Sequence, residues 1–190
     1  MEENGWVVEY LPSGHASDLR KESVVQLIGV QAFTLLEASV KTNANINIGQ
    51  KLYVGKGERS EVERIRRRIT YEDLTNSGKD FLPNVLRKAV EEREADFMRF
   101  INNAKPISIR VHTLDLLPGV GKKNMELMLA EREKKKFENF QDLKARVPTL
   151  GDPIGVFVSR IVSELHGVEK HYLFVRPPAE IQRQHFGRRY

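Results

Sequence analysis

The string Leu117–Lys123, which reads Leu-Pro-Gly-Val-Gly-Lys-Lys, constrains the fold of this chain more than any other segment. Pro118 lacks an amide hydrogen and ends a preceding helix. Gly119 and Gly121 permit backbone angles that other residues avoid, and they let a foreign backbone come close. The string therefore predicts a tight hairpin between two helices, with Val120 inserted into the core.

The start of the helix after this hairpin is a candidate anion site. The helix is expected over Asn124–Lys134, and the first amides of a helix have no partner within it, while the helix dipole favours negative charge there. Two lysines add positive charge at the same place. The pattern predicts a seat for a nucleic-acid phosphate; the alternative is a tight turn that only joins two packed helices. The predicted site residues are Pro118, Gly119, Val120, Gly121, Lys122 and Lys123.

A weaker copy of the string lies thirty positions downstream, at Val147–Pro153. Asn139 is expected to cap a short helix before this copy, and a helix is expected to begin at Asp152 and Pro153 and run to about Leu165. Because Asp152 puts a carboxylate where the first copy has a lysine, the second hairpin is predicted to be mainly structural or a much weaker phosphate contact. The matching residues are Pro148 with Pro118, Leu150 with Val120 and Gly151 with Gly121, whereas Thr149 replaces the first glycine.

Two hairpins at this spacing resemble the tandem helix-hairpin-helix domain, which in its relatives grips phosphates along the minor groove of a duplex. Hairpin carbonyls in that family sometimes hold a monovalent cation, and the equivalent atoms here belong to Leu117 and Val120; no other cofactor and no metal is expected. Base-excision glycosylases carry a similar hairpin followed by a catalytic aspartate, and Lys123 and Asp142 have a similar spacing. Asp142 lies outside that family's Val-Asp-Thr-His context, so the chain is expected not to be an enzyme.

The N-terminal third is predicted to form strands. Its apolar runs are rich in β-branched and aromatic residues, and turn-prone residues separate them. Several short strands in so few residues predict a small barrel or curled sheet, which resembles an OB fold. The predicted strands are Val7–Tyr10, Val24–Val30, Ala32–Val40 and Lys51–Val54.

Helices are predicted in the middle of the chain. Glu61–Ile69 is expected to be a short basic helix, in which the arginines either contact phosphates or form a solvated face paired with local glutamates. Asp80–Asn102 has apolar residues at three- and four-residue steps and is expected to be one long helix. Pro106 is expected to end it, and Ile107–Val111 to return a strand to the barrel. The arginines concerned are Arg64, Arg66, Arg67 and Arg68.

The fold expected from these segments is α+β. It comprises an OB-like β domain over residues 1–70, connecting helices over 71–105, a tandem helix-hairpin-helix domain over 106–170 and a basic tail over 171–190.

Composition narrows the partner and the compartment. The net charge of +5 and the pI of about 9.4 favour polyanionic partners, and Arg188 and Arg189 in the tail are further candidate contacts. The chain has no cysteine, which excludes disulfides and thiolate metal sites. A secretory signal and a bilayer-spanning apolar run are not recognised, so a cytoplasmic location is expected.

The order of strands, long helix, tandem hairpins and basic tail resembles a conserved archaeal family of unknown function that is predicted to bind nucleic acid. The resemblance covers nearly the whole chain. It implies a non-catalytic protein that contacts the phosphate backbone of structured RNA or duplex DNA, with a leaning towards RNA. The alternative is a protein-interaction scaffold in which the hairpins only pack helices.

Overall fold

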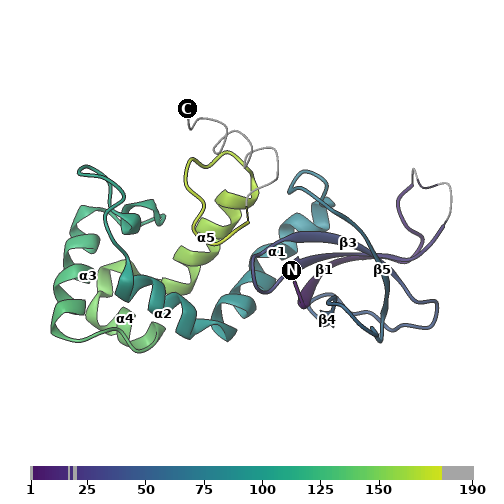
Figure 1. Cartoon of the computed structure of the whole chain (residues 1–190), viewed down its shortest axis with the longest axis horizontal. Coiled ribbons are helices and arrows are strands. Elements are labelled where there is room, and N and C mark those ends of the chain that lie inside the picture. The colour runs from purple at the N-terminus through teal and green to yellow at the C-terminus, as the bar shows by residue number, and fades with distance from the viewer. Residues whose placement is uncertain (1, 17, 19–20, 177–190) are drawn as a thin grey trace. The chain divides into compact units, whose positions relative to one another are not determined.

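The structure, a computed structural model, describes residues 2–16, 18 and 21–176. It contains two compact units, one formed by the residues up to Val85 with those from Ile161 onward and the other by Leu86–Arg160. Helices α1 (Asn76–Glu92) and α5 (Pro153–Leu165) contribute residues to both units. Over the described residues the class is mixed α+β, with a curled antiparallel half-barrel of five strands and with five α-helices (Figure 1). The expected α+β class is confirmed; the finer division into domains stays a prediction.

The half-barrel belongs to the first unit. Its strands run in the order β4-β1-β2-β3-β5, and every neighbouring pair is antiparallel. The four strands predicted from the sequence are confirmed, because their alternating apolar residues form one buried core that includes Val7, Leu27 and Leu52. The strands are β1 (Asn4–Leu11), β2 (Val24–Gly29), β3 (Leu35–Val40), β4 (Lys51–Tyr53) and β5 (Val62–Arg68).

The prediction of a basic helix at Glu61–Ile69 is wrong, since this segment is strand β5. Val62 and Ile65 are three residues apart, as on a helical face, but they pair with Val40 and Ala38, which are two residues apart on β3. The register of β5 shifts between these pairs, so one extra residue is accommodated in the strand. Because of this irregular register, the apolar residues of the strand have the three-residue spacing that is typical of a helix.

The predicted strand at Ile107–Val111 is also wrong. The amides of Ile107 and Ser108 both donate to the carbonyl of Val111, at 2.8 and 3.1 Å, so the segment turns back on itself. Within this loop a single bridge joins Pro106 to His112. The closed loop leaves no extended backbone to pair with a sheet.

The predicted helix at Asp80–Asn102 is present but divided. It begins earlier, as α1, and is followed by α2 (Glu94–Asn103). The break falls at Arg93, whose φ of −106° and ψ of 24° lie outside the helical region. The apolar periodicity predicted the helical content but not this break.

The second unit contains α2, α3 (Lys122–Lys134), α4 (Phe140–Arg146) and two short 3-10 turns at Thr113–Leu116 and Pro148–Leu150. Phe157 of α5 lies at the centre of its aromatic core, with its ring centroid 4.6 Å from that of Phe97 and 5.9 Å from that of Phe140. The expected cap at Asn139 is confirmed, because its side chain accepts from the amide of Asp142 at 2.7 Å. In the described part of the chain, no helix combines the length and the apolar character needed to cross a membrane.

Candidate functional site

The first hairpin is a tight turn whose third residue has a backbone conformation that favours glycine. The amide of Val120 donates to the carbonyl of Leu117 at 3.0 Å, which closes the turn around Pro118 and Gly119. Gly119 has a φ of +79°, a backbone region that favours glycine. Val120 is 5% exposed and is therefore inserted in the core, as expected. The proline, the glycine and the valine thus fix the direction in which α3 leaves the turn.

The start of α3 is unobstructed. The helix begins at Lys122, two residues earlier than predicted, and Gly121 is its N-cap with no side-chain hydrogen bond to the first-turn amides. A Cβ atom added at Gly119 or Gly121 would meet no atom within 4 Å. The two glycines therefore leave open space beside the start of the helix, where a ligand can approach the backbone closely.

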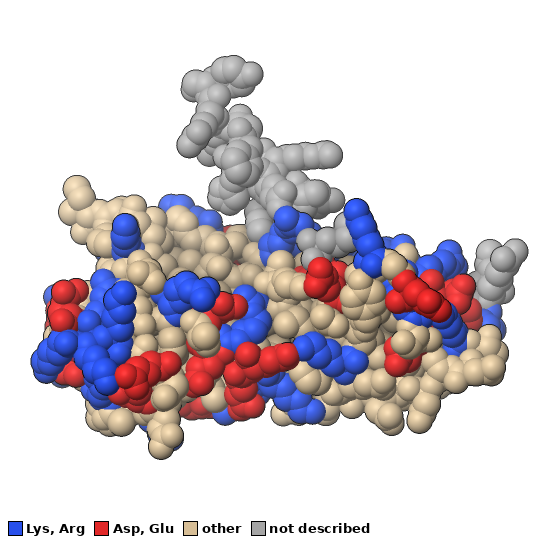
Figure 2. Space-filling view, turned by 60° about the horizontal axis from the view of Figure 1, so that its bottom comes forward, with Lys and Arg blue, Asp and Glu red and all other residues tan. Residues whose placement is uncertain are grey.

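The two lysines at this helix start keep most of their positive charge unneutralised. The Lys122 ammonium is 3.9 Å from the Glu126 carboxylate, and both side chains are largely exposed, so this pair contributes little. Within the described residues, Lys123 is exposed and forms no ion pair. Figure 2 shows Lys and Arg side chains gathered over the part of the molecule that carries α3 and α4, with Asp and Glu among them. Within the described residues, neither lysine at the hairpin has an acidic partner closer than 3.9 Å, whereas Lys134 and Lys135 at the other end of α3 pair with Glu131 at 2.5 Å and Glu138 at 2.7 Å.

The second hairpin has the same turn but a different helix start. Gly151 has a φ of +74° and Leu150 is 8% exposed, which parallels the first copy. Asp152 forms an ion pair with Arg87 at 2.6 Å and accepts from the amides of Gly155 and Ile154. The guanidinium of Arg87 is the largest influence that lowers the pKa of Asp152, and those amides lower it further. The chain's own carboxylate therefore occupies the anion position at the start of α5.

Asn124 joins the two hairpins, a role that the sequence interpretation missed. Its side-chain amide donates to the carbonyls of Gly119 at 3.2 Å and Thr149 at 3.5 Å. The hydroxyl of Thr149 donates to the side-chain oxygen of Asn124. The sequence signal for this contact was a polar side chain in the first turn of the helix that follows a hairpin. The contact gives Thr149, which replaces the first glycine in the second copy, a structural role.

His112 supports the turn that leads into the first hairpin. Its Nδ1 accepts from the amide of Leu114 at 3.1 Å, and the carboxylate of Asp115 accepts from the amide of His112 at 2.8 Å. This reciprocal cap needs an imidazole that is unprotonated at Nδ1. Burial lowers the pKa of His112, and the positive charge of Arg132 lowers it further.

This cap predicts a loss of stability in mild acid. The pKa of His112 is lower when folded than when unfolded, so its contribution is complete above the unfolded value of about 6.5 and declines as the pH falls through the folded value. The free energy of unfolding is expected to fall by up to about 1.4 kcal/mol per pH unit between the two values. His112→Asn retains a capping oxygen without titrating, so urea unfolding from pH 7 to 5 is expected to give a flatter profile than the wild type. Parallel profiles for the two proteins would contradict this assignment.

The basic cluster of β5 lies in the first unit, and most of it is paired with carboxylates. Its charges are therefore largely balanced within that unit, whereas the hairpin belongs to the second unit. Arg188 and Arg189 lie outside the described residues. The contacts are Arg64 with Glu22 at 2.9 Å, Arg66 with Asp18 at 3.1 Å, Arg67 with Glu37 at 3.4 Å, and Arg68 with the carbonyl of Arg176.

The residues considered for other chemistry have structural contacts. The carboxylate of Asp142 accepts from the amide of Glu138 at 3.1 Å and from Arg146 at 3.2 Å, as a residue of the first turn of α4. The carbonyl of Leu117 already accepts from Val120, so it offers a cation only its second lone pair. In the described part of the chain, no group of three or more His, Asp or Glu side chains is arranged to hold a metal ion.

Comparison with known proteins places the chain among archaeal relatives. The family model described as "Protein of unknown function (DUF655)" matches residues 1–176. The uncharacterized protein MJ0038 of Methanocaldococcus jannaschii is 41% identical over 177 residues, covering 92% of this chain and 80% of that protein. The crystal structure of Af1531 from Archaeoglobus fulgidus, described as a member of the same family, has a TM-score of 0.87 and 38% identity, and the match covers 92% of this chain and 100% of that one. The chain therefore belongs to the DUF655 family of proteins of unknown function.

Proposed function

We propose that this chain is a non-catalytic nucleic-acid-binding protein that contacts the phosphate backbone of structured RNA or duplex DNA through the hairpin at Leu117–Lys123. In this proposal the second unit acts as a tandem helix-hairpin-helix module and the half-barrel as an OB-like companion. The observation that carries the proposal is the contrast between the two helix starts. Asp152 fills the start of α5, whereas the N-cap of α3 is a glycine, with open space beside it and two lysines directly after it.

A phosphate suits this position because its oxygens accept from several amides at once. The first turn of a helix presents amides that point in one direction, and the dipole adds partial positive charge. Gly121 leaves room for the close approach that an amide–phosphate hydrogen bond of about 2.9 Å requires. Lys122 and Lys123 supply the charge that displaces counterions from a nucleic acid.

The second hairpin has a supporting role in this proposal. Asn124 holds the turns of both hairpins together through the carbonyls of Gly119 and Thr149. The carboxylate of Asp152 repels a phosphate from the second turn, so Gly151 lies beside the bound backbone rather than anchoring it. In this proposal the first hairpin binds the phosphate, and the second hairpin fixes the orientation of the first.

The arginines of β5 are a secondary surface. Arg64, Arg66 and Arg67 already form ion pairs with Glu22, Asp18 and Glu37. A nucleic acid therefore gains less by contacting them than by contacting Lys123, which forms no ion pair with the residues that the structure describes. Contacts to phosphates carry no direct sequence information. We therefore expect binding that depends weakly on sequence.

A salt series tests the proposal. Fluorescence anisotropy with labelled duplex RNA, duplex DNA and single strands is expected to show that the logarithm of the binding constant falls linearly with the logarithm of the salt concentration. Duplexes of different sequence are expected to bind within a few-fold of one another. The scaffold alternative predicts no binding to any of these probes at low salt, and that outcome would refute the proposal.

The variant Gly121→Ala tests phosphate binding at the hairpin separately from the stability of the fold. The φ of Gly121 is −75°, which any residue adopts, and the added methyl meets no atom within 4 Å. Stability is therefore expected to change by less than about 1 kcal/mol, because the reduced freedom of the unfolded chain offsets the poorer fit of alanine at an N-cap. Binding is expected to weaken about five-fold, because the methyl hinders one charge-assisted hydrogen bond worth about 1 kcal/mol or more. Thermal unfolding and anisotropy measured together check this, and unchanged affinity would argue against backbone contact at this position.

A further inference from the structure

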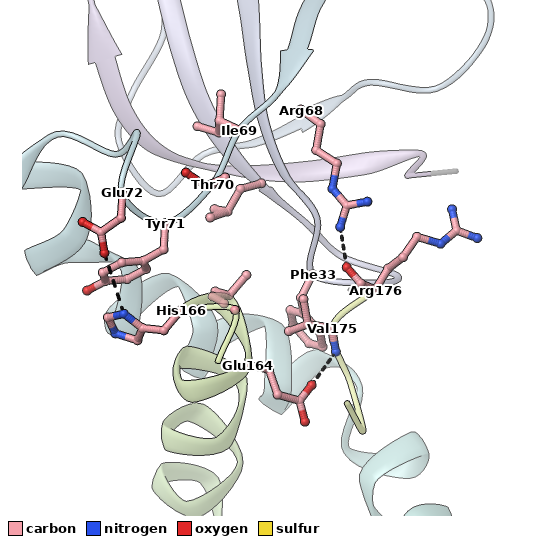
Figure 3. A pocket seen from close by; sticks show the side chains of 13 residues that line it. Phe33, Arg68, Ile69, Thr70, Tyr71, Glu72, Glu164, His166, Val175 and Arg176 are labelled. Carbon is pink, nitrogen blue, oxygen red and sulfur yellow. Dashed lines mark hydrogen bonds and ion pairs between the residues drawn. The ribbon is translucent and has the colours of Figure 1, made fainter. Parts of the chain in front are cut away.

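A pocket of about 260 Å³ lies within the first unit, whereas the hairpin proposed to bind phosphate belongs to the second unit. Buried side chains of Phe33, Leu35, Ile69 and Val175 form much of its wall. Its contributors come from the half-barrel, the turn after β5, the end of α5 and the segment that contains Val175 and Arg176 (Figure 3). Since a cavity of roughly 150 Å³ already holds benzene, this pocket has room for a planar ring system.

One side of the pocket carries two guanidinium groups with no carboxylate bound to them. Arg68 of β5 donates to the backbone carbonyl of Arg176, and within the described residues neither side chain forms an ion pair. Partial burial lowers the pKa of Arg68, and the neighbouring charge of Arg176 lowers it further. A bound anion reduces the repulsion between two neighbouring positive charges.

The nearby buried carboxylates are already engaged with amides. Glu164 accepts from the amides of Leu173, Phe174 and Val175 at 2.7 to 2.9 Å. The negative charge of Glu2 favours the charged form of Arg68. The Glu2 carboxylate accepts hydrogen bonds from three further amides, those of Gln31, Ala32 and Thr34. Both carboxylates hold the chain around the pocket, and neither forms an ion pair with the two arginines.

The opposite side of the pocket is aromatic. Figure 3 shows Tyr71, Glu72 and His166 across the pocket from Arg68 and Arg176. The rings of Tyr71 and His166 lie 4.0 Å apart between centroids. Glu72 is paired with Lys79 at 3.1 Å, so this side has little net charge. An aromatic side and a cationic side together select a ligand with a flat body and an anionic group.

The backbone at the pocket wall is strained. Phe33 has a φ of +48°, which is uncommon for a bulky residue, and its side chain is 1% exposed. Strained residues persist where their surroundings hold them, and they concentrate at ligand sites. The Glu2 carboxylate, which binds the amides on both sides of Phe33, provides that support here.

We propose that this pocket binds a nucleotide, with its phosphate between the guanidinium groups of Arg68 and Arg176 and its base in the apolar cavity beside Tyr71 and His166. The site is independent of the hairpin. The same chemistry is offered by a free nucleoside monophosphate and by the phosphorylated end of a strand. The base fits the cavity, and the negative charge of the phosphate complements the positive charges of the two guanidinium groups.

Calorimetry with the full chain tests the pocket. The probes are AMP, GMP, CMP and UMP. The nucleoside part and the phosphate part of such a ligand are measured separately with adenosine, guanosine and inorganic phosphate. At least one monophosphate is expected to bind about ten-fold tighter than either part, because both sides of the pocket then contribute. A 5′-phosphorylated trinucleotide that binds tighter still assigns the site to a strand end, and weaker binding assigns it to the free nucleotide.

Substitution of the two arginines provides the decisive comparison. Arg68→Gln and Arg176→Gln are each expected to weaken monophosphate binding about ten-fold while leaving the affinity for the nucleoside unchanged. Arg64→Gln removes the same charge from the same strand, at a residue paired with Glu22, and is the matched control. Since Arg176 donates no side-chain hydrogen bond to the described residues, its variant tests the site even if Arg68→Gln fails to fold.

Two outcomes would overturn the nucleotide site. One is that none of the monophosphates binds better than its nucleoside, and the other is equal monophosphate affinity in Arg176→Gln and Arg64→Gln. Lys122→Glu combined with Lys123→Glu is expected to leave monophosphate binding intact. Failure of the hairpin and failure of the pocket are therefore measured separately.

Discussion

Replacing Lys122 and Lys123 together with glutamate is expected to weaken binding to duplex RNA or DNA about thirty-fold or more at 0.1 M salt. Each lysine that leaves a phosphate contact lowers the slope of the salt dependence by about 1, so the slope is expected to fall by about 2. The new carboxylates also repel phosphates at the start of α3. Fluorescence anisotropy across a salt series measures both quantities, and the loss is expected for every sequence tested.

The matched control is Lys134→Glu with Lys135→Glu at the other end of α3. It changes the net charge of the chain equally, and its lysines already pair with Glu131 and Glu138 at 2.5 and 2.7 Å. The 13 residues of α3 separate the two ends by about 20 Å. Similar losses of affinity in both double variants would mean that binding follows the overall charge, and the hairpin would lose its assigned role.

Phe157→Ala is expected to reduce the free energy of unfolding by about 4 kcal/mol. Phe157 is 1% exposed, and its ring packs against Phe97, Phe100 and Phe140. Removing the ring creates a cavity among aromatic side chains that are too rigid to refill it, and edge contacts between rings are lost as well. Urea unfolding followed by circular dichroism checks the change.

Phe157→Leu is the companion variant. It keeps most of the apolar volume and loses only the aromatic contacts, so a smaller loss of about 1.5 kcal/mol is expected. Because this core supports both hairpins within the second unit, nucleic-acid affinity is expected to follow the folded fraction in either variant. A loss below 1.5 kcal/mol for the alanine variant would show that the aromatic cluster is not the main support of this unit.

The hairpin was predictable because its chemistry is local. Proline, a glycine at positive φ and a buried valine act within four consecutive residues, so their order in the sequence already describes the turn. The cap at Asn139 and the start of α5 were predictable for the same reason, since a cap bonds to amides two or three residues away. The first four strands followed from their apolar residues and the turn residues between them.

Strand β5 was not predictable from its own residues. Val62 and Ile65 have a helical spacing because the register against β3 is irregular, and that irregularity exists only once β3 is beside them. The carboxylates that form the closest ion pairs with its arginines belong to Asp18, Glu22 and Glu37, which are 30 or more positions away in the sequence. A run of charge in a sequence therefore says little about how much of it remains unpaired.

The sequence by itself determined the α+β class, the position of the two turns and the difference between a lysine and an aspartate at the helix starts. The tertiary structure alone decided which charges are neutralised, as with Arg87 and Asp152, and which form no ion pair within the described part of the chain, as with Arg68 and Arg176. It also brought Phe33, Ile69 and Val175 together around one cavity. The physical reason is range: turns and caps depend on bonds between near neighbours in the chain, whereas ion pairs and cavities depend on residues that only folding brings into contact.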